Sequence, residues 1–399
     1  MFITLPMTDF QFIRKWFKWY KIFAIEERKP VYAITESGIE FRCSYILSGL
    51  NLETIGKNLH TYKVQKLVGN LDYSKLRTPL TIISEDEMKY MINDCLVVMA
   101  YIQEYIDTLG NITKILITKT SFVRQLCRNN CFYGGDASHR KDVSKYKRYQ
   151  RYIKNLVITS PQEYEQMVRA FQGGYTHGSC LGIGLTYENV ASYDFTSSYP
   201  YVMCAYAEYP ITTGKLVTIK DMKQFEDYLK IYCCIFDVEF THLESKIDFE
   251  HYISSSKCVI EGFNIEDNGR VVYADILKTT ITHIDFEIIK ATYQWNKIRI
   301  KNFRIYKKGY LPRDLILTIL KFYSDKTTLK GVEEELINYQ SAKANVNSIY
   351  GCMVTSVVRT QHNYNNDVWE DSEPNLIEEL EKYDNSKTRF NFYGWGLLS

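Results

Sequence analysis

The sequence predicts a mixed α/β protein with at least two domains. Its 399 residues exceed the roughly 250–300 at which a single hydrophobic core stops growing. Helical and β-type patterns both occur: apolar residues recur at helical spacing after Ser84, whereas Tyr232–Phe240 is rich in β-forming residues.

The composition excludes several classes of protein. With 45% hydrophobic and 24% charged residues, the chain is neither wholly disordered nor a disulfide-rich mini-scaffold. No apolar run reaches the roughly 18 residues that a membrane span needs, and the ten scattered cysteines suit free thiols in a reducing compartment. A net charge of +2 does not identify a nucleic-acid-binding protein, so such a function would depend on local patches. We therefore expect a cytoplasmic protein without a membrane partner.

Two N-terminal capping signals locate helices and a domain boundary. Ser84, with a glutamate three residues later, predicts a capping box and a helix that ends at Gly110. Ser160 predicts a second capping box, with a proline at the first helical position and a glutamate at the third. The boundary then falls near residue 155 and divides the chain into domains 1–155 and 156–399.

The segments after this boundary alternate in type. An apolar strand is expected at Val190–Phe195. Helices are expected at Thr282–Trp295, at Leu311–Tyr323 and at Glu333–Tyr350, the last of them ending at Gly351. The tail at Asn363–Ser386 is polar, and we expect it to be rich in loops.

One stretch concentrates positive charge. Between His139 and Lys154, seven cations stand against one acid, with tyrosines at three-residue intervals. This pattern fits either a solvated linker or a strip that contacts phosphates and offers rings for stacking. Taken alone, the run favours the linker.

Two short constellations carry the chemistry. Asp194 ends the apolar strand candidate and precedes a turn closed by Pro200, which is a way to present a rigid carboxylate to divalent metal ions. Farther along, Lys343, Asn347 and Tyr350 share one face of the expected helix. A cation, an amide and a phenol in this order suit contacts with a triphosphate, a base and a sugar.

These constellations resemble two motifs of family B DNA polymerases. Asp194-Phe-Thr-Ser-Ser-Tyr-Pro200 resembles motif A, with Ser198 where leucine is usual, and Lys343–Gly351 matches motif B in full. Phe171-Gln-Gly-Gly174 is similar to the Tyr-x-Gly-Gly element of the protein-primed branch found in phages and linear plasmids. The resemblance implies an incomplete ribonuclease-H-like exonuclease domain followed by an incomplete polymerase palm and fingers.

The exonuclease resemblance is partial. Tyr90 and Asp94, on one face of the helix after Ser84, resemble the third exonuclease motif, and Asn70–Tyr73 lies upstream at the usual spacing. Asp9 falls where the acid of the second motif would lie, without its usual neighbours, and the first motif has no match. Because two-metal hydrolysis needs more carboxylates than these, we expect no metal-dependent degradation of single-stranded DNA by this chain.

The resemblance also implies roles at the polymerase site. Asp194 and the carbonyl of Phe195 would bind Mg²⁺ or Mn²⁺, and Tyr199 would lie under the sugar and exclude a 2′-hydroxyl. Lys343 would be catalytic: together with Lys326, it would neutralise the phosphate charge that develops on the leaving pyrophosphate. The other nucleotide contacts would be Ser197, Asn347 and Tyr350. The template contacts would be Phe171, Gly173, Gly174, Tyr175 and Gly351. The implied partners are primer–template DNA, dNTPs and a terminal priming protein, for which residues 205–305 and 355–390 are the candidate receiving insertions.

The sequence also departs from the family pattern. Motif C, Tyr-x-Asp-Thr-Asp, has no match after Gly351, and the nearest candidate acid, Asp384, lies in a charged context without a strand pattern. We therefore predict a DNA-directed DNA polymerase that is truncated before motif C and the thumb, and that binds primer–template DNA but extends it poorly. The alternative is a catalytically incomplete DNA-binding or split subunit of such a polymerase.

Two features resemble metal sites without satisfying them. Cys127, Cys131 and His139 could supply three zinc ligands, but no fourth ligand follows at finger-like spacing. His177 stands beside the glycine pair, and we expect it to be a polar contact to the template or a surface residue.

Overall fold

The fold is mixed α/β, as the sequence predicts. The computed structural model describes residues 2–4, 10–67, 74–78, 80–133, 143–332, 336–365 and 368–398. The chain divides into two units, each assembled from three separate segments. Unit 1 comprises Met1–Gln125, Leu329–Ser341 and Arg359–Pro374, and unit 2 comprises Leu126–Thr328, Ala342–Val358 and Asn375–Ser399.

Unit 1 is built around a six-stranded sheet with the order β1-β4-β3-β2-β12-β13. Its strands are β1 (Phe2–Thr4), β2 (Trp19–Glu26), β3 (Lys29–Thr35), β4 (Glu40–Arg42), β12 (Gln361–Asn365) and β13 (Val368–Ser372). β1 pairs with β4 in parallel, and the other neighbours are antiparallel. Phe10, Ala33 and Phe41 form a buried cluster against this sheet.

The helices of unit 1 include α4, whose ends follow the sequence prediction. They are α1 (Phe10–Ile13), η1 (Arg14–Trp16), α2 (Ser44–Ser48), α3 (Leu52–Lys57), α4 (Glu85–Leu109) and η2 (Ile112–Lys114). The Ser84 hydroxyl accepts a hydrogen bond from the Glu87 N–H, and the Glu87 carboxylate accepts one from the Ser84 N–H, which confirms the capping box. Gly110 ends α4 in the left-handed conformation, also as predicted.

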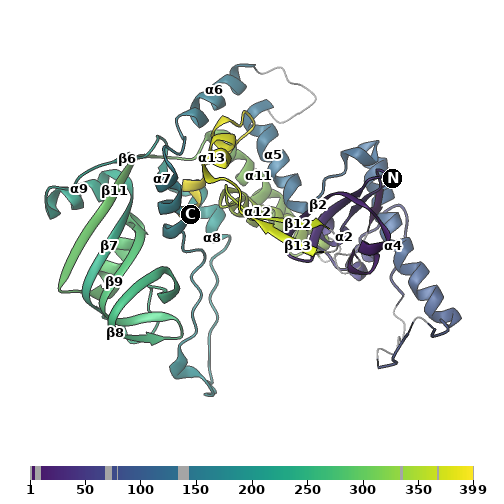
Figure 1. Cartoon of the computed structure of the whole chain (residues 1–399), viewed down its shortest axis with the longest axis horizontal. Coiled ribbons are helices and arrows are strands. Elements are labelled where there is room, and N and C mark those ends of the chain that lie inside the picture. The colour runs from purple at the N-terminus through teal and green to yellow at the C-terminus, as the bar shows by residue number, and fades with distance from the viewer. Residues whose placement is uncertain are drawn as a thin grey trace. The chain divides into compact units, whose positions relative to one another are not determined.

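Unit 2 contains a seven-stranded antiparallel sheet with the main order β5-β11-β7-β9-β8. Its strands are β5 (Tyr209–Pro210), β6 (Lys215–Leu216), β7 (Tyr232–Ser245), β8 (Cys258–Asp267), β9 (Arg270–Thr282), β10 (Tyr293–Gln294) and β11 (Lys297–Gly309). Figure 1 shows β7, β8, β9 and β11 as long strands lying side by side. The β-rich stretch predicted at Tyr232–Phe240 is confirmed and continues to Ser245.

One face of this sheet is the core of unit 2. Val238 and Phe240 of β7 pack with Phe225 of α9 (Met222–Ile231) and Phe286 of α10 (His283–Thr292). The helix expected to begin at Thr282 is α10, and Thr282 is its N-cap in a capping box. Along β7 these buried residues alternate with half-buried acids, so the opposite face of the sheet is polar.

Several further helices belong wholly or partly to unit 2. They are α5 (Lys119–Tyr133), α6 (Val143–Lys154), α7 (Pro161–Ala170), α8 (Ser198–Ala205), α11 (Arg313–Leu329), α12 (Leu336–Met353) and α13 (Leu376–Asn385), with the short turns η3 (Cys180–Gly182), η4 (Ser255–Lys257) and η6 (Tyr393–Leu397). In the part of the chain that the structure describes, no helix combines the length and the apolar character needed to cross a membrane.

The second capping box is only half formed. Ser160 caps α7 as predicted, but the Glu163 carboxylate does not return to the Ser160 N–H. It accepts hydrogen bonds from the Thr159 N–H (2.7 Å) and the Tyr306 hydroxyl (2.6 Å). Glu163 is fully buried, and a buried carboxylate is stabilised best by the nearest strong donors, here including a tyrosine of β11.

The tail expected to be loop-rich is largely regular. Residues 363–386 contain most of β12, all of β13 and α13. Tyr364 and Trp369 are cross-strand neighbours with ring centroids 5.2 Å apart, and Leu380 of α13 is buried. The prediction was wrong because a few well-placed apolar side chains anchor these elements despite the polar composition.

Candidate functional site

Two tyrosines from distant parts of the sequence stack in unit 2. Tyr199 lies in α8 and Tyr350 in α12, and their ring centroids are 4.2 Å apart with an interplanar angle of 24°. Burial raises the pKa of Tyr350 to about 12, with smaller contributions from Tyr199 and Tyr393. The structure therefore brings the two predicted motifs together at this pair.

A buried lysine from another helix contacts the segment that carries Tyr199. Lys326 of α11 is 8% exposed, and its ammonium donates a hydrogen bond to the Ser197 hydroxyl at 2.7 Å. Ser197 precedes α8 in a left-handed backbone conformation, with φ of 53°. Among the described residues, no carboxylate forms an ion pair with Lys326. A buried cation without a counter-charge is costly, so this position favours an anionic ligand.

The glycine pair passes close to the stacked tyrosines. Gly173 has a left-handed backbone, with φ of +75°, which favours glycine. A Cβ on Gly174 would lie 2.9 Å from the Tyr199 hydroxyl, so a side chain there would displace the tyrosine. Phe171, just before this turn, is the half-buried C-cap of α7.

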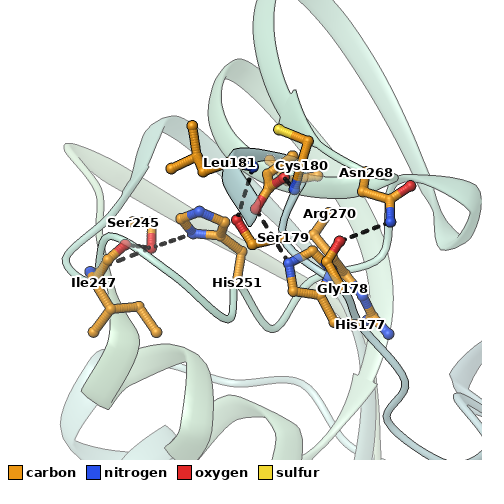
Figure 2. A network of polar contacts seen from close by, with 12 residues as sticks. His177, Gly178, Ser179, Cys180, Leu181, Ser245, Ile247, His251, Asn268 and Arg270 are labelled. Carbon is orange, nitrogen blue, oxygen red and sulfur yellow. Dashed lines mark hydrogen bonds and ion pairs between the residues drawn. The ribbon is translucent and has the colours of Figure 1, made fainter. Parts of the chain in front are cut away.

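The residues after the glycine pair are fastened to the turn between β8 and β9. The Asp267 carboxylate accepts a hydrogen bond from the Cys180 N–H at 2.7 Å and contacts the His177 ring at 3.2 Å. Asn268 and Arg270 donate to the backbone carbonyls of residues 178 and 176, both at 2.8 Å. Figure 2 shows this network around His177 and Cys180. Hydrogen bonds from Cys180, Ser179 and His177 hold the pKa of Asp267 well below its usual range.

His177 and Tyr175, next to the glycine pair, both contact other parts of unit 2. The His177 side chain is only 2% exposed, so it is a buried anchor of the loop rather than a surface residue. The Arg270 guanidinium lies 4.6 Å from the Tyr175 ring centroid, and the Tyr175 hydroxyl donates to the His251 carbonyl at 3.3 Å. These contacts order the segment that follows the glycine turn.

Asp194 and Phe195 lie in a segment without regular structure. The strand predicted at Val190–Phe195 is absent, and these residues are exposed, with Tyr193 at 93% and Phe195 at 86%. Figure 1 shows the whole segment as a long excursion that leaves α7 and returns to α8. An isolated strand is not stable because its backbone needs a hydrogen-bonding neighbour, and no described strand pairs with this one.

Motif B, in contrast, forms an ordered helix. The α12 side chains of Val346 and Ile349 are buried, whereas Lys343 and Asn347 are exposed. We expected this helix to end at Gly351, but it continues to Met353. Burial of Cys352 and Met353 stabilises this last turn, and the Gly351 backbone has no positive φ.

The candidate exonuclease residues lie in unit 1 on α4. Tyr90 and Asp94 are both half-buried, and the Lys66 ammonium lies 5.7 Å from the Tyr90 ring centroid. Burial raises the pKa of Asp94, and Lys66 lowers it. Asp9 and Asn70–Tyr73 lie outside the described residues.

The described part of the basic stretch, residues 143–154, is the helix α6 rather than a linker. The rest of the stretch lies outside the described residues. Tyr149 is buried with its hydroxyl directed to the Phe390 carbonyl, and Lys145 pairs with Asp314 at 3.0 Å. Because helical spacing turns these rings inward, Tyr149 is not available to a nucleic acid.

The remaining candidate metal ligands are Asp384 and the set Cys127, Cys131 and His139. Asp384 pairs with Arg389 at 2.8 Å and accepts a hydrogen bond from the Ile158 N–H. Cys127 and Cys131 are buried in α5, while His139 lies outside the described residues. Among described residues there is no group of three or more histidine, cysteine or acidic side chains that could hold a metal ion.

The sequence interpretation missed the β8–β9 turn. Its signal was present: Asp267-Asn-Gly-Arg270 places an Asn-Gly pair between two strands, which is typical of a tight hairpin. The sequence could not predict that this hairpin forms hydrogen bonds with the loop after the glycine pair, because that contact joins segments far apart in sequence.

The chain is similar in sequence to a known family of proteins. A family model described as DNA polymerase type B, organellar and viral, matches residues 36–392. A comparison with curated proteins gave no match.

Several solved structures of the Phi29 DNA polymerase are similar in fold. The complex with primer-template DNA after translocation has a TM-score of 0.58 at 15% identity, covering 91% of this chain and 60% of that chain. The ternary complex with incoming nucleotide substrates has a TM-score of 0.61 at 16% identity, with coverages of 97% and 67%. The complex with single-stranded DNA has a TM-score of 0.61 at 17% identity, with coverages of 97% and 66%.

The two kinds of comparison support different conclusions. At such low identity the structural matches establish the fold, and the chain spans 60% of the length of the first of these polymerases. The family model extends over most of the sequence, and the chain therefore belongs to the organellar and viral type B DNA polymerases.

Proposed function

We propose that the chain is part of a protein-primed DNA-directed DNA polymerase that adds dNTPs to the 3′ end of a primer. The observation that carries this proposal is the buried Lys326 hydrogen-bonded to Ser197, in the segment whose Tyr199 stacks on Tyr350. A cation without a carboxylate partner among the described residues, next to aromatic rings, suits a nucleoside triphosphate.

Each residue of this group has a proposed role. Lys326 binds phosphate oxygens, and Ser197 orients its ammonium. Tyr199 lies under the sugar, where the stack with Tyr350 fixes its ring. Lys343 and Asn347, exposed on α12, extend the contacts to the triphosphate and the nascent base pair.

Asp194 fits one ligand position for Mg²⁺. Its carboxylate is exposed and forms no ion pair with a described residue, and carboxylate oxygen is the ligand type that Mg²⁺ prefers. Magnesium sites of this kind use one or two carboxylates together with substrate phosphates. When bound, the ion would offset triphosphate charge and polarise the attacking hydroxyl.

DNA is the proposed macromolecular partner. The glycine turn at Gly173-Gly174 offers a close approach to a template strand, and the solved Phi29 polymerase complexes contain primer-template or single-stranded DNA. We also propose the division into an exonuclease-like domain, 1–155, and a polymerase domain, 156–399. A terminal priming protein is a further proposed partner. The proposed location is the cytoplasm, which for a phage protein is the host cytoplasm.

A specific observation favours a second candidate, a split or catalytically incomplete DNA-binding subunit. Val190, Tyr193 and Phe195 expose large apolar side chains around Asp194. An exposed apolar segment without a strand partner is a natural site for pairing with a strand from another polypeptide. In that case DNA binding would be present, and synthesis would need the second polypeptide.

The first test compares two lysines of α11 in the full chain. Lys326→Ala removes the buried cation, whereas Lys321→Ala removes an exposed one from the same helix. We expect Lys326→Ala to weaken dATP binding to the protein–primer–template complex about 10- to 100-fold, since hydrogen bonds to charged groups contribute roughly 1.5–3 kcal/mol. Lys321→Ala should bind dATP as the unaltered chain does. Equal affinities for both variants would contradict the assignment.

A filter-binding titration and a primer-extension assay on one preparation test both candidate functions. We expect primer–template binding that weakens steeply with salt and poor extension, because Asp194 is not held by a strand. Robust extension would exclude the second candidate. Absence of DNA binding at low salt would exclude both.

A further inference from the structure

The polar face of the unit 2 sheet carries a groove that the proposed nucleotide site does not use. The groove has a volume of about 330 Å³ and crosses strands β11, β7, β9 and β8. We call it the sheet-face groove. Its cationic lining residues are Arg169, Lys257, Lys278, Arg299 and Lys301.

Strand register places these charges in rows. Arg299 of β11 lies opposite Glu239 of β7, which lies opposite Lys278 of β9. In the next row Lys301 lies opposite Asp237. Since alternate residues of a strand point to the same side, both rows face the groove.

The cations outnumber the acids that could neutralise them. Glu239 is shared by Arg299 at 3.3 Å and Lys301 at 3.7 Å, and Asp237 pairs with Arg169 at 3.4 Å. Lys278 pairs with Glu261 outside the groove. Lys257 forms no ion pair with a described residue, so the groove retains an excess of positive charge.

The groove adjoins the glycine turn. Arg169 lies in the last turn of α7, three residues before Gln172. Gln172 and Lys257 together line a small neighbouring cavity. This cavity and the groove share Lys257 and Thr279, so the groove lies close to the glycine turn.

The dimensions and chemistry fit a short run of nucleic-acid backbone. Four strands spaced about 4.8 Å apart span about 14 Å, which is enough for a few consecutive phosphates of a single strand. The described lining contains no aromatic ring, so it offers contacts to phosphates and none for base stacking.

We propose that the sheet-face groove binds the phosphate backbone of the single-stranded template next to the glycine turn. This inference rests on the proposed function, since it presupposes a template. Binding there would be independent of sequence, because only phosphates are contacted.

The test measures how the affinity for primer–template depends on the length of the template overhang. The full chain is titrated by fluorescence anisotropy with DNA whose single-stranded template overhang is either one or eight nucleotides. We expect the longer overhang to bind about tenfold more tightly. The triple variant Lys257→Ala, Arg299→Ala, Lys301→Ala should lose this gain and reduce the salt slope by about 2, at roughly 0.7 per phosphate contact.

A matched control removes the same charge elsewhere. Lys220→Ala, Lys223→Ala, Lys230→Ala changes exposed lysines on and before α9, which do not line the groove. This control should keep the overhang gain, and Glu239→Gln, which removes a negative charge from the groove, should increase it. Thermal unfolding of each variant verifies that it is folded.

Each other outcome has a defined meaning. An overhang gain that survives in the groove variant, or is lost equally in the control, overturns the inference and leaves the proposed function intact. No primer–template binding by the unaltered chain overturns the proposed function itself. A glutamate-rich peptide can be added as a competitor. If it binds the unaltered chain but not the triple groove variant, and the triple variant still binds the longer overhang more tightly, then the groove binds an acidic protein segment instead of DNA.

Discussion

Motif A and motif B belong to the same unit but differ in how they are held. Motif B lies on α12, where Val346 and Ile349 are buried and every turn supplies its own backbone hydrogen bonds. Asp194 of motif A lies in an exposed segment with no strand partner among the described residues. A helical motif is thus preformed by its own chain segment, whereas an extended motif depends on neighbours or ligands.

The largest expected effect is on the free energy of unfolding, and it comes from the difference in burial between the two motifs. Ile349→Ala should lower the free energy of unfolding by about 2–5 kcal/mol, because Ile349 is fully buried and leaves a cavity. Phe195→Ala should change it by less than about 0.5 kcal/mol, because Phe195 is 86% exposed. Urea unfolding of both variants measures this. Similar losses would mean that the motif A segment is packed.

An intermediate effect tests the contact that joins the motifs. In a double-mutant cycle, Tyr199→Ala and Tyr350→Ala should show a coupling energy of about 0.5–1.5 kcal/mol, since the rings are stacked at 4.2 Å. The matched cycle with Tyr193→Ala, which removes a 93% exposed ring, should show no coupling to Tyr350. Coupling in both cycles, or in neither, would argue against a specific stack.

The smallest expected effect concerns the part of the loop before motif A that Asp267 holds by hydrogen bonds, at His177 and Cys180. The pKa of Asp267 is lowered from its ordinary value of 3.8 by its hydrogen-bond donors, so its stabilisation is present above pH 3.8 and lost as the pH falls below that value. The protection factor of the Cys180 amide, which compares its exchange with that of an unprotected amide at the same pH, should therefore fall in acid. Asp267→Asn should show a low protection factor at neutral pH as well. A Cys180 amide that stays protected in the variant would show that other contacts hold the loop.

The sequence predicted the elements whose signals are local. The caps at Ser84, Ser160 and Thr282 and the β-rich start of β7 all appear where expected. The strand at Val190–Phe195 failed because strand formation depends on a partner that a local pattern does not contain. The end of α12 was misplaced because burial of Met353 overrides the glycine signal.

The sequence predicted which residues belong to the site better than it predicted the contacts between them. The motif patterns identified Tyr199, Tyr350 and Lys326, and the structure adds that the first two stack and that the third contacts Ser197. The Asp267 network and the sheet-face groove were missed because both depend on tertiary pairing between segments that are distant in sequence.

Hydrogen exchange of the full chain, with and without primer–template DNA, dATP and Mg²⁺, tests the central claim most directly. We predict that peptides covering residues 190–200 exchange rapidly in the free protein and slowly in the complex, because substrate and metal supply the partners that motif A lacks. Peptides of α12 should be protected in both states. If DNA binds but residues 190–200 exchange equally fast with and without dATP and Mg²⁺, motif A does not form a nucleotide site in this chain, and the account is contradicted.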